Sequence, residues 1–482
     1  MNDRIGIDLG TSGVKTVRFH ANGNAVRMAT ADYPMAQPQN GWAEQDPADW
    51  WHAVQQTLDE VGTDGVACIG LSGQMHGLVM LDAQGEVIRP AILWCDQRTG
   101  AQCEEITARV GRAQLIEWTA NPALPGFTLP KLLWVREHEP QNYARCRHIL
   151  LPKDYIRYKL TGVLATDMSD ASGTQLLDVR NRCWSGKMLD TMAINSALLP
   201  PLYESTAIVG YYRGIPVAAG GGDNACAAVG CGAVRPGKAF TTIGTSGVVY
   251  AHTDRPVIDP QGRVHTFCCA VPGQWHVMGV TQAAGLSLKW FRHTFAPETS
   301  YAQMDRMAAQ VPIGAERLLW LPYLMGERTP HLDGAARGVF FGVSAIHGQP
   351  HFVRSVMEGV CYSLRDCAEV LRSMNVPLTD MAACGGGSVS SLWMQMLAGC
   401  LHLPVTTLKT QEGAARGAAI LAAVGAGLES SVEAACDRQI VPGRTIAPEH
   451  SADYDRFYEI YRSLYPALKP SFAALARLGS EI

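Results

Sequence analysis

An aspartate and a glycine-rich turn stand together near the start of the chain. Asp8 ends an expected strand at residues 4–9, and the turn Gly10-Thr11-Ser12-Gly13 follows directly. The backbone N–H groups and hydroxyls of such a turn can bind phosphate, and a neighbouring carboxylate suits a Mg²⁺ ion held through water. A plain hairpin uses the same residue types, with Asp8 then only capping the turn amides. The predicted phosphate contacts are Thr11, Ser12 and Gly13, and the predicted metal ligand is Asp8.

The same pattern returns in the second half of the chain. Residues 242–248 repeat the strand, turn and strand of residues 8–14. Two copies are harder to explain as hairpins alone, because two facing turns would hold a triphosphate from both sides. Thr242 takes the place of Asp8, so the repeat predicts a single metal site. The predicted phosphate contacts of the second copy are Gly244, Thr245 and Ser246.

A third glycine-rich segment leads into another aspartate. Gly220-Gly221-Gly222-Asp223-Asn224 ends an expected strand at residues 215–219 and begins a helix of small residues. The glycines clear space around the carboxylate of Asp223, as a general base requires. An ordinary aspartate at a helix N-cap is the alternative, and local sequence does not separate the two.

Polar residues between glycines follow the expected strand at residues 66–71. Gln74 and His76, in Ser72-Gly73-Gln74-Met75-His76-Gly77, are suited to hydroxyl recognition, although a loop histidine is more often plain surface. Further along the chain, another short strand is followed by side chains that would add hydrogen bonds to the same pocket. These are Trp94, Asp96 and Arg98.

A late glycine turn offers a place for a flat ring. Gly385-Gly386-Gly387 follows an expected strand at residues 381–384 and precedes a helix expected from Ser388. A second helix from Glu412 has an unusually small face, which predicts close packing against that turn. Close packing of the helix without a ligand is an equal alternative.

The elements that would hold these groups alternate between strands and helices. Asp46-Pro47 supplies an N-cap and a first-turn proline for a helix to about Val61. The alternation predicts an α/β fold, and the repeated turn predicts two duplicated domains, at residues 1–233 and 234–482.

Composition excludes several other classes. The chain has 482 residues, 47% of them hydrophobic, and a net charge of −4 from 40 basic and 44 acidic side chains without a basic block, which argues against a nucleic-acid partner. Its 14 scattered cysteines and its start predict a cytoplasmic protein with reduced thiols, and no apolar run is long enough for a membrane span. The Rossmann, zincin and hydrolase-elbow motifs are absent, and residues 232–239 lack the P-loop hydroxyl.

Two long spaced patterns resemble signatures of the FGGY carbohydrate kinases. One is Gly-x-Thr-x-x-Lys-Leu-x-Trp-Val-x-Glu-His at residues 126–138, and the other spans residues 338–358. The loop Gly326-Glu327-Arg328-Thr329-Pro330 is similar to one in the second domain of that family. The resemblance covers essentially the whole chain. It implies two ATPase domains of the actin and hexokinase type, with ribonuclease H-like cores, flanking a cleft.

The resemblance also implies an activity and its residues. It implies ATP- and Mg²⁺-dependent phosphorylation of a ketopentose, with D-xylulose ahead of ribulose, an arabinitol or a gluconate-like acid, since Met75-His76 replaces the arginine–glutamate pair of glycerol kinases. A nucleotide-dependent sugar sensor is the alternative of another class, and a homodimer is possible. Asp223 would take the proton, Gln74, Met75, His76 and Asn224 would contact the sugar, and Gly385 and Gly386 would lie near the adenosine.

Overall fold

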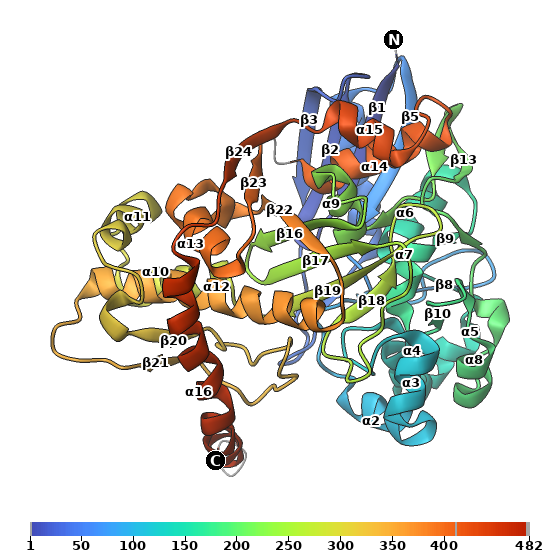
Figure 1. Cartoon of the computed structure of the whole chain (residues 1–482). Coiled ribbons are helices and arrows are strands. Elements are labelled where there is room, and N and C mark those ends of the chain that lie inside the picture. Colours follow the sequence, from blue (N-terminus) through green and yellow to red (C-terminus); the bar gives the residue numbers. More distant parts are fainter. Residues whose placement is uncertain (1, 410–411, 479–482) are drawn as a thin grey trace. The chain divides into compact units, whose positions relative to one another are not determined.

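The computed structural model describes residues 2–409 and 412–478, and these fall into two compact units (Figure 1). Unit 1 comprises residues 1–235, 252–276 and 412–440, and unit 2 comprises residues 236–251, 277–411 and 441–482. The units therefore interleave along the chain, whereas the expected division has one boundary, at residues 233/234. The α/β architecture is confirmed.

Unit 1 contains a seven-stranded mixed sheet. Its order is β13-β14-β5-β1-β2-β3, with β15 also pairing with β5. Strands β1, β2 and β3 form an antiparallel meander, and β5 runs parallel to β1, β14 and β15. The strands are β1 (Asp3–Leu9), β2 (Gly13–Phe19), β3 (Ala25–Asp32), β5 (Val66–Gly73), β13 (Ile208–Tyr212), β14 (Ile215–Ala218) and β15 (Gly221–Gly222).

Short strand pairs and helices complete unit 1. The pairs are β4 (Glu44–Gln45) with β7 (Ala91–Ile92), β6 (Val79–Leu81) with β8 (His148–Leu150), β9 (Thr166–Asp167) with β12 (Leu202–Tyr203), and β10 (Leu177–Asp178) with β11 (Cys183–Trp184). The helices are α1 (Pro47–Val61), α2 (Gly100–Val110), α3 (Arg112–Thr119), α4 (Thr128–His138), α5 (Pro140–Arg145), α6 (Pro152–Thr161), α7 (Met168–Ala171), α8 (Gly186–Met192), α9 (Asp223–Cys231), α14 (Gly413–Gly425) and α15 (Val432–Gln439).

A second seven-stranded sheet, most of whose strands belong to unit 2, has the order β18-β19-β17-β16-β22-β23-β24. Its strands are β16 (Gly237–Ile243), β17 (Gly247–Thr253), β18 (His265–Cys268), β19 (Trp275–Thr281), β22 (Leu378–Cys384), β23 (Val405–Leu408) and β24 (Pro442–Ile446), and β20 (Leu319–Leu321) pairs separately with β21 (Val339–Phe341). The helices of unit 2 are α10 (Gly285–Phe295), α11 (Tyr301–Ala309), α12 (Gln349–Ser373), α13 (Ser391–Leu401) and α16 (Ser451–Leu478).

Local signals place several of these elements where the sequence predicts them. The Asp46 side chain accepts a hydrogen bond from the Ala48 N–H at 2.9 Å, and Pro47 begins α1, which ends at Val61 as expected. The helix expected from Ser388 begins later, at Ser391. Ser390 is its N-cap and accepts a hydrogen bond from the Trp393 N–H at 3.0 Å, so this boundary was wrong.

The two copies of the repeated turn are both hairpins, but their registers differ by one residue. In the first, Leu9 pairs with Val14, and the Gly10 N–H donates to the Gly13 carbonyl. In the second, Ile243 pairs with Gly247. The same four-residue sequence therefore forms two turns of different length, because the pairing of the flanking strands selects the turn.

Helix α14 packs within unit 1, in orange-red beside the blue strands of the sheet (Figure 1). Cβ atoms at Gly6 of β1 and Gly70 of β5 would collide with the carbonyl oxygens of Ala415 and Ala418. Gly417 is equally close to α9. The small face of α14 therefore serves close helix-to-sheet and helix-to-helix packing, and the expectation that it packs against the Gly385 turn was wrong.

Candidate active site

Three strands of unit 1 end together and bring the two predicted aspartates near each other. In the strand register, Ser72 of β5 lies opposite Asp8 of β1 on one side and Gly221 of β15 on the other. The Ser72 hydroxyl donates to Asp8 Oδ1 at 3.1 Å. Asp223 begins α9 immediately after β15. Parallel strands thus place both carboxylates at one edge of the sheet, where sites form in open α/β sheets.

The glycines before Asp223 are required by their surroundings. Gly220 has φ +78°, and a Cβ there would also collide with the Leu71 carbonyl oxygen. The helix N-cap is Gly222, so the alternative of Asp223 as an ordinary N-cap was wrong. Asp223 Oδ1 instead accepts hydrogen bonds from the backbone N–H and the side-chain amide of Asn224, at 2.7 and 3.0 Å.

The electrostatic surroundings of the two carboxylates favour protonation. Burial, and then the negative charge of Asp8, raise the pKa of Asp223 to about 7. Burial also raises the pKa of Asp8, although the Ser72 hydrogen bond and the charge of Lys15 oppose this. The negative charges of Asp8 and Asp223 repel each other and are only partly solvated. A divalent cation would neutralise this charge and would therefore bind favourably here.

The loop with Met75 and His76 lies against the same turn. A Cβ at Gly222 would come within 2.8 Å of Met75 Cγ, so Met75 packs on the residue before Asp223. The half-buried His76 ring donates through Nδ1 to the Gly173 carbonyl at 3.1 Å and lies 5.0 Å from the Phe127 ring. The structure therefore brings the predicted sugar loop and the predicted base together.

Side chains of helix α4 donate hydrogen bonds to the Met75–His76 loop. The Thr128 hydroxyl and Lys131 Nζ donate to the His76 carbonyl at 3.1 and 3.2 Å. Lys131 also donates to the carbonyl groups of Gly126 and Phe127, and burial lowers its pKa to about 7. His76 has φ +68°, a left-handed conformation that is unfavourable for a residue with a side chain. The hydrogen bonds from Thr128 and Lys131 to its carbonyl group maintain this conformation.

Gln74 and Trp94 connect to the first glycine turn. Gln74 is buried, and its Nε2 donates to Gln45 Oε1 at 3.0 Å. Gln45 Nε2 donates in turn to the Thr11 carbonyl at 2.8 Å, and Trp94 Nε1 donates to Thr11 Oγ1 at 3.0 Å. Gln74 thus holds the turn in place, while Trp94 is partly exposed beside it.

Asp96 and Arg98 pair with each other and with neighbouring residues of unit 1. Asp96 is fully buried, and its Oδ2 accepts hydrogen bonds from the Ala43 N–H at 2.6 Å and from Arg98 at 2.7 Å. The Arg98 guanidinium lies 3.7 Å from the ring centre of Trp42 and 2.7 Å from Glu44 Oε1. Both side chains are therefore held by partners within the protein, and their contact with the sugar stays a prediction.

Unit 2 contains a cavity of about 520 Å³ at the second glycine turn. Of the residues predicted to contact the nucleotide, Gly244, Thr245 and Gly386 line this cavity, whereas Ser246 and Gly385 are not among its lining residues. The turn is held by α10, since the Gly285 N–H donates to the Gly244 carbonyl at 2.7 Å. A Cβ at Gly386 would meet open space. The cavity therefore lies beside the turn that the sequence predicts to bind phosphate, with open space at Gly386.

Some site residues were not predicted. Ser72 donates a hydrogen bond to Asp8. Its position at the end of an expected strand, next to the predicted site loop, could have indicated this role. No spacing in the sequence indicated the cavity residues of α10, α11 and α13. They are Leu286, Leu288, Lys289, Tyr301, Ala302, Asp305 and Trp393.

Known families match both halves of the chain. The profile for the N-terminal domain of the FGGY family of carbohydrate kinases matches residues 4–230, and that for the C-terminal domain matches residues 239–426. The chain therefore belongs to the FGGY family of carbohydrate kinases, which use ATP.

Individual relatives cover almost the full length. A xylulose kinase from Bacillus subtilis (strain 168) is 40% identical over 493 aligned positions, which cover 98% of each chain. The crystal structure of a xyloylose kinase from Brucella ovis is 37% identical, with a TM-score of 0.92, and the match covers 97% of this chain and 100% of that one. A gluconate kinase structure from Lactobacillus acidophilus has a TM-score of 0.94 at 27% identity, covering 98% and 99%.

Among the residues that the structure describes, no helix combines the length and apolarity needed to cross a membrane.

Proposed function

We propose that this kinase transfers the γ-phosphoryl group of ATP to the terminal hydroxyl of D-xylulose, giving D-xylulose 5-phosphate and ADP. The observation that carries the proposal is the half-buried Asp223 carboxylate beside the Met75–His76 loop. Relatives with 40% identity over nearly the whole chain are xylulose kinases, which supports the choice of sugar.

Asp223 acts as the general base of the transfer. Its carboxylate takes the proton of the attacking hydroxyl as the sugar oxygen bonds to the γ-phosphorus and the bond to the β–γ bridging oxygen breaks. A raised pKa near 7 matches a base that must pick up a proton at neutral pH. Asn224 is hydrogen-bonded to the Asp223 carboxylate, and Met75 packs against Gly222, the residue before Asp223. Asn224 and His76, which follows Met75 in the chain, are proposed to orient the sugar hydroxyls. Met75 is proposed to form an apolar wall of the sugar site.

Nucleotide binding is assigned to the two glycine turns and the cavity. The adenosine is proposed to lie in the cavity at Gly386, with phosphates at Gly244 and Thr245. Thr11, Ser12 and Gly13 are proposed to contact the transferring phosphoryl group through backbone N–H groups and hydroxyls.

A Mg²⁺ ion fits the carboxylates of unit 1. Asp8 is half-buried beside a second acidic group, Asp223, and the described residues contain no cluster of three or more His, Cys, Asp or Glu placed to hold a metal. Mg²⁺ suits such a site because it keeps several waters and binds through one or two carboxylates plus phosphates. When bound, it would neutralise charge on the phosphates. Asp8 is its proposed ligand.

A second sugar has one observation in its favour. The gluconate kinase structure has a TM-score of 0.94, against 0.92 for the xyloylose kinase structure. Similarity of fold therefore does not distinguish a ketose substrate from a sugar acid. The identity to xylulose kinases favours the ketose.

The test is a panel of sugars with ATP and Mg²⁺, in which ADP release is measured. We expect kcat/KM for D-xylulose to exceed that for ribulose, arabinitol and gluconate by about tenfold or more, since unpaired polar groups strongly penalise a wrong sugar. Asp223→Asn should lower kcat by about 10²–10⁴ while the shape of the site is kept. A preference for gluconate would overturn the choice of sugar, and an active Asn variant would overturn the assignment of the base.

A further inference from the structure

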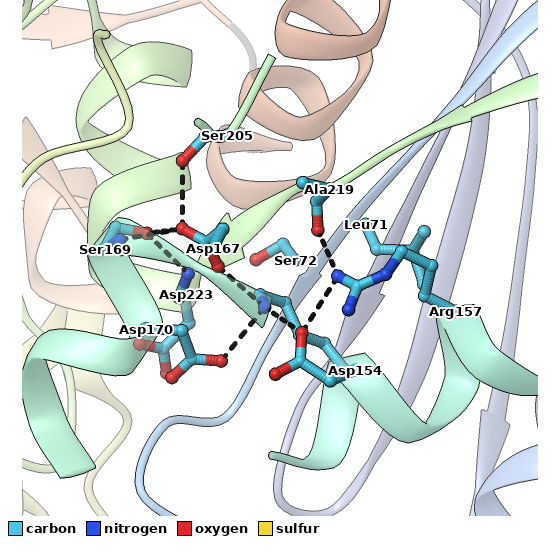
Figure 2. Close-up of polar contacts among 12 residues, drawn as sticks. Leu71, Ser72, Asp154, Arg157, Asp167, Ser169, Asp170, Ser205, Ala219 and Asp223 are labelled. Atoms are coloured by element: carbon cyan, nitrogen blue, oxygen red, sulfur yellow. Dashed lines mark hydrogen bonds and ion pairs between the residues drawn. The ribbon is translucent and has the colours of Figure 1, made fainter. Parts of the chain in front are cut away.

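A cluster of charged side chains is buried directly behind the turn that carries Asp223. This buried charge cluster consists of Lys153, Asp154, Arg157, Asp167 and Asp170, all of them fully buried. Lys153 Nζ lies 2.6 Å from Asp154 Oδ1, 2.7 Å from Asp167 Oδ1 and 3.3 Å from Asp170 Oδ2. Figure 2 shows Asp154, Asp167 and Asp170 grouped beside the chain that leads into Asp223.

Arg157 of the cluster and Ser169, which is hydrogen-bonded to the cluster, hold the two ends of the glycine turn. At the start, Arg157 donates to the Ala219 carbonyl at 2.7 Å. At the end, the Gly222 N–H donates to Ser169 Oγ at 3.2 Å (Figure 2). Gly220, Gly221 and Gly222 have no side chains, so the turn depends on hydrogen bonds from outside for its conformation.

The Ser169 hydroxyl is oriented by the cluster. Its oxygen lies 2.5 Å from Asp167 Oδ2, and the Ser169 N–H donates to the same oxygen at 2.8 Å. A hydroxyl has one proton, so donation to Asp167 turns a lone pair toward the Gly222 N–H. Asp167 is in turn held by Lys153. The order Lys153, Asp167, Ser169, Gly222 thus connects buried charges to the peptide before Asp223.

The desolvation cost of the buried charge cluster indicates that the cluster does more than stabilise the fold. Burying several charges costs desolvation free energy, and well-packed apolar residues often stabilise a core as well or better. Charged hydrogen bonds, in contrast, are directional and fix geometry. A general base must be held within a few tenths of an ångström of its productive position, and small misplacements cost much of the rate.

We propose that Ser169 is a positioning residue: with Asp167 and Lys153 behind it, it fixes the Gly222 peptide and thereby aims the Asp223 carboxylate at the sugar hydroxyl. The inference rests on the proposed function, in which Asp223 is the base. Ser169 itself touches neither the sugar nor the nucleotide in this role.

The chain offers a matched control for the test. Ser205 is also buried, and its hydroxyl donates to the same Asp167 Oδ2, at 2.9 Å, but its side chain is not hydrogen-bonded to the glycine turn. Ser169→Ala and Ser205→Ala each remove one hydroxyl from the same carboxylate. The structural cost of the two substitutions should therefore be similar, and only the first frees the Gly222 N–H.

The experiment measures kcat, both KM values and the melting temperature of full-length wild type, Ser169→Ala and Ser205→Ala. We expect Ser169→Ala to lower kcat by about 10- to 100-fold with both KM values within about twofold, because ground-state binding does not need the base. Ser205→Ala should keep kcat within about twofold, while the two melting temperatures fall by similar amounts.

Three results would overturn the proposal: an unchanged kcat in Ser169→Ala, equal losses of kcat in both variants, or a loss confined to KM. Failure of the proposed function looks different, since the wild type would then not phosphorylate D-xylulose or Asp223→Asn would remain active. If the wild type is active on D-xylulose and Asp223→Asn is not, an unchanged kcat in Ser169→Ala would contradict only the positioning role of Ser169.

Discussion

At the scale of single residues, the proposed chemistry of the site depends on a carboxylate that is held partly out of water. Burial and the charge of Asp8 raise the pKa of Asp223 to about 7, from an ordinary value near 4. The raised pKa makes the carboxylate a better proton acceptor at neutral pH. It also makes the ionised folded state less stable, so function and stability oppose each other at this residue.

A pH series measures both effects. The proposed base, Asp223, must be ionised to act, so kcat/KM for D-xylulose should fall on the acid side with an apparent pKa near 7. The folded pKa is above the unfolded one, so the stability that Asp223 contributes is lost as the pH rises from about 4 through 7. Asp223→Asn should therefore melt at a higher temperature than wild type at pH 8 and at a similar temperature near pH 4. A lower melting temperature at pH 8 would contradict the buried-charge account.

At the scale of elements, helix α14 shows how small residues permit close packing. Its backbone approaches β1, β5 and α9 so nearly that Gly6, Gly70 and Gly417 have no room for a Cβ. The obstructing atoms at Gly70 belong to the Ala418 backbone, which cannot rotate away as a side chain can. The sheet edge that carries Asp8 therefore depends on this helix for its position.

Replacing Gly70 with alanine tests this packing. We expect Gly70→Ala to lower the free energy of unfolding by about 1–3 kcal/mol or more, because the added methyl group forces helix and sheet apart. Gly186→Ala is the control, since a Cβ there meets nothing within 4 Å and its φ is not left-handed. The control should change stability by less than about 0.5 kcal/mol in urea denaturation. Equal losses in the two variants would show that α14 has more room than the structure indicates.

At the scale of the whole molecule, each compact unit is assembled from separate stretches of chain. Residues 412–440 complete the core of unit 1, where Ala415 and Ala419 pack on Val17 and Phe19. Ala422 and Ala423 pack on Cys68 and Ala218 in the same way. Unit 1 therefore closes only after nearly the whole chain has been made.

An isolated fragment of residues 1–235 should consequently not fold cooperatively. It lacks α14 and α15, so the apolar surface beneath them would be exposed to water. We expect circular dichroism to show no sharp thermal transition and a dye for apolar surface to bind strongly. The full-length protein is the control. A cooperative transition of the fragment would show that the N-terminal stretch is a folding unit on its own.

The sequence by itself determined the features that depend on neighbouring residues. Asp46-Pro47 begins α1, the glycine turns follow strand ends, and the three glycines before Asp223 permit a left-handed backbone at Gly220. These conformations follow from steric freedom and hydrogen bonds within a few residues, so a local pattern predicts them. The long family signatures added the fold and the class of enzyme.

Only the tertiary structure decided which distant partners each group meets. Asp96 and Arg98 contact partners at residues 42–44, α14 packs on the strands and on α9 of unit 1, and identical turn sequences adopt two registers. Ser169 lies next to Gly222 only because α7 and β15 meet in space. Such contacts join residues far apart in the sequence, and their free energies depend on burial and competing partners that no local pattern records.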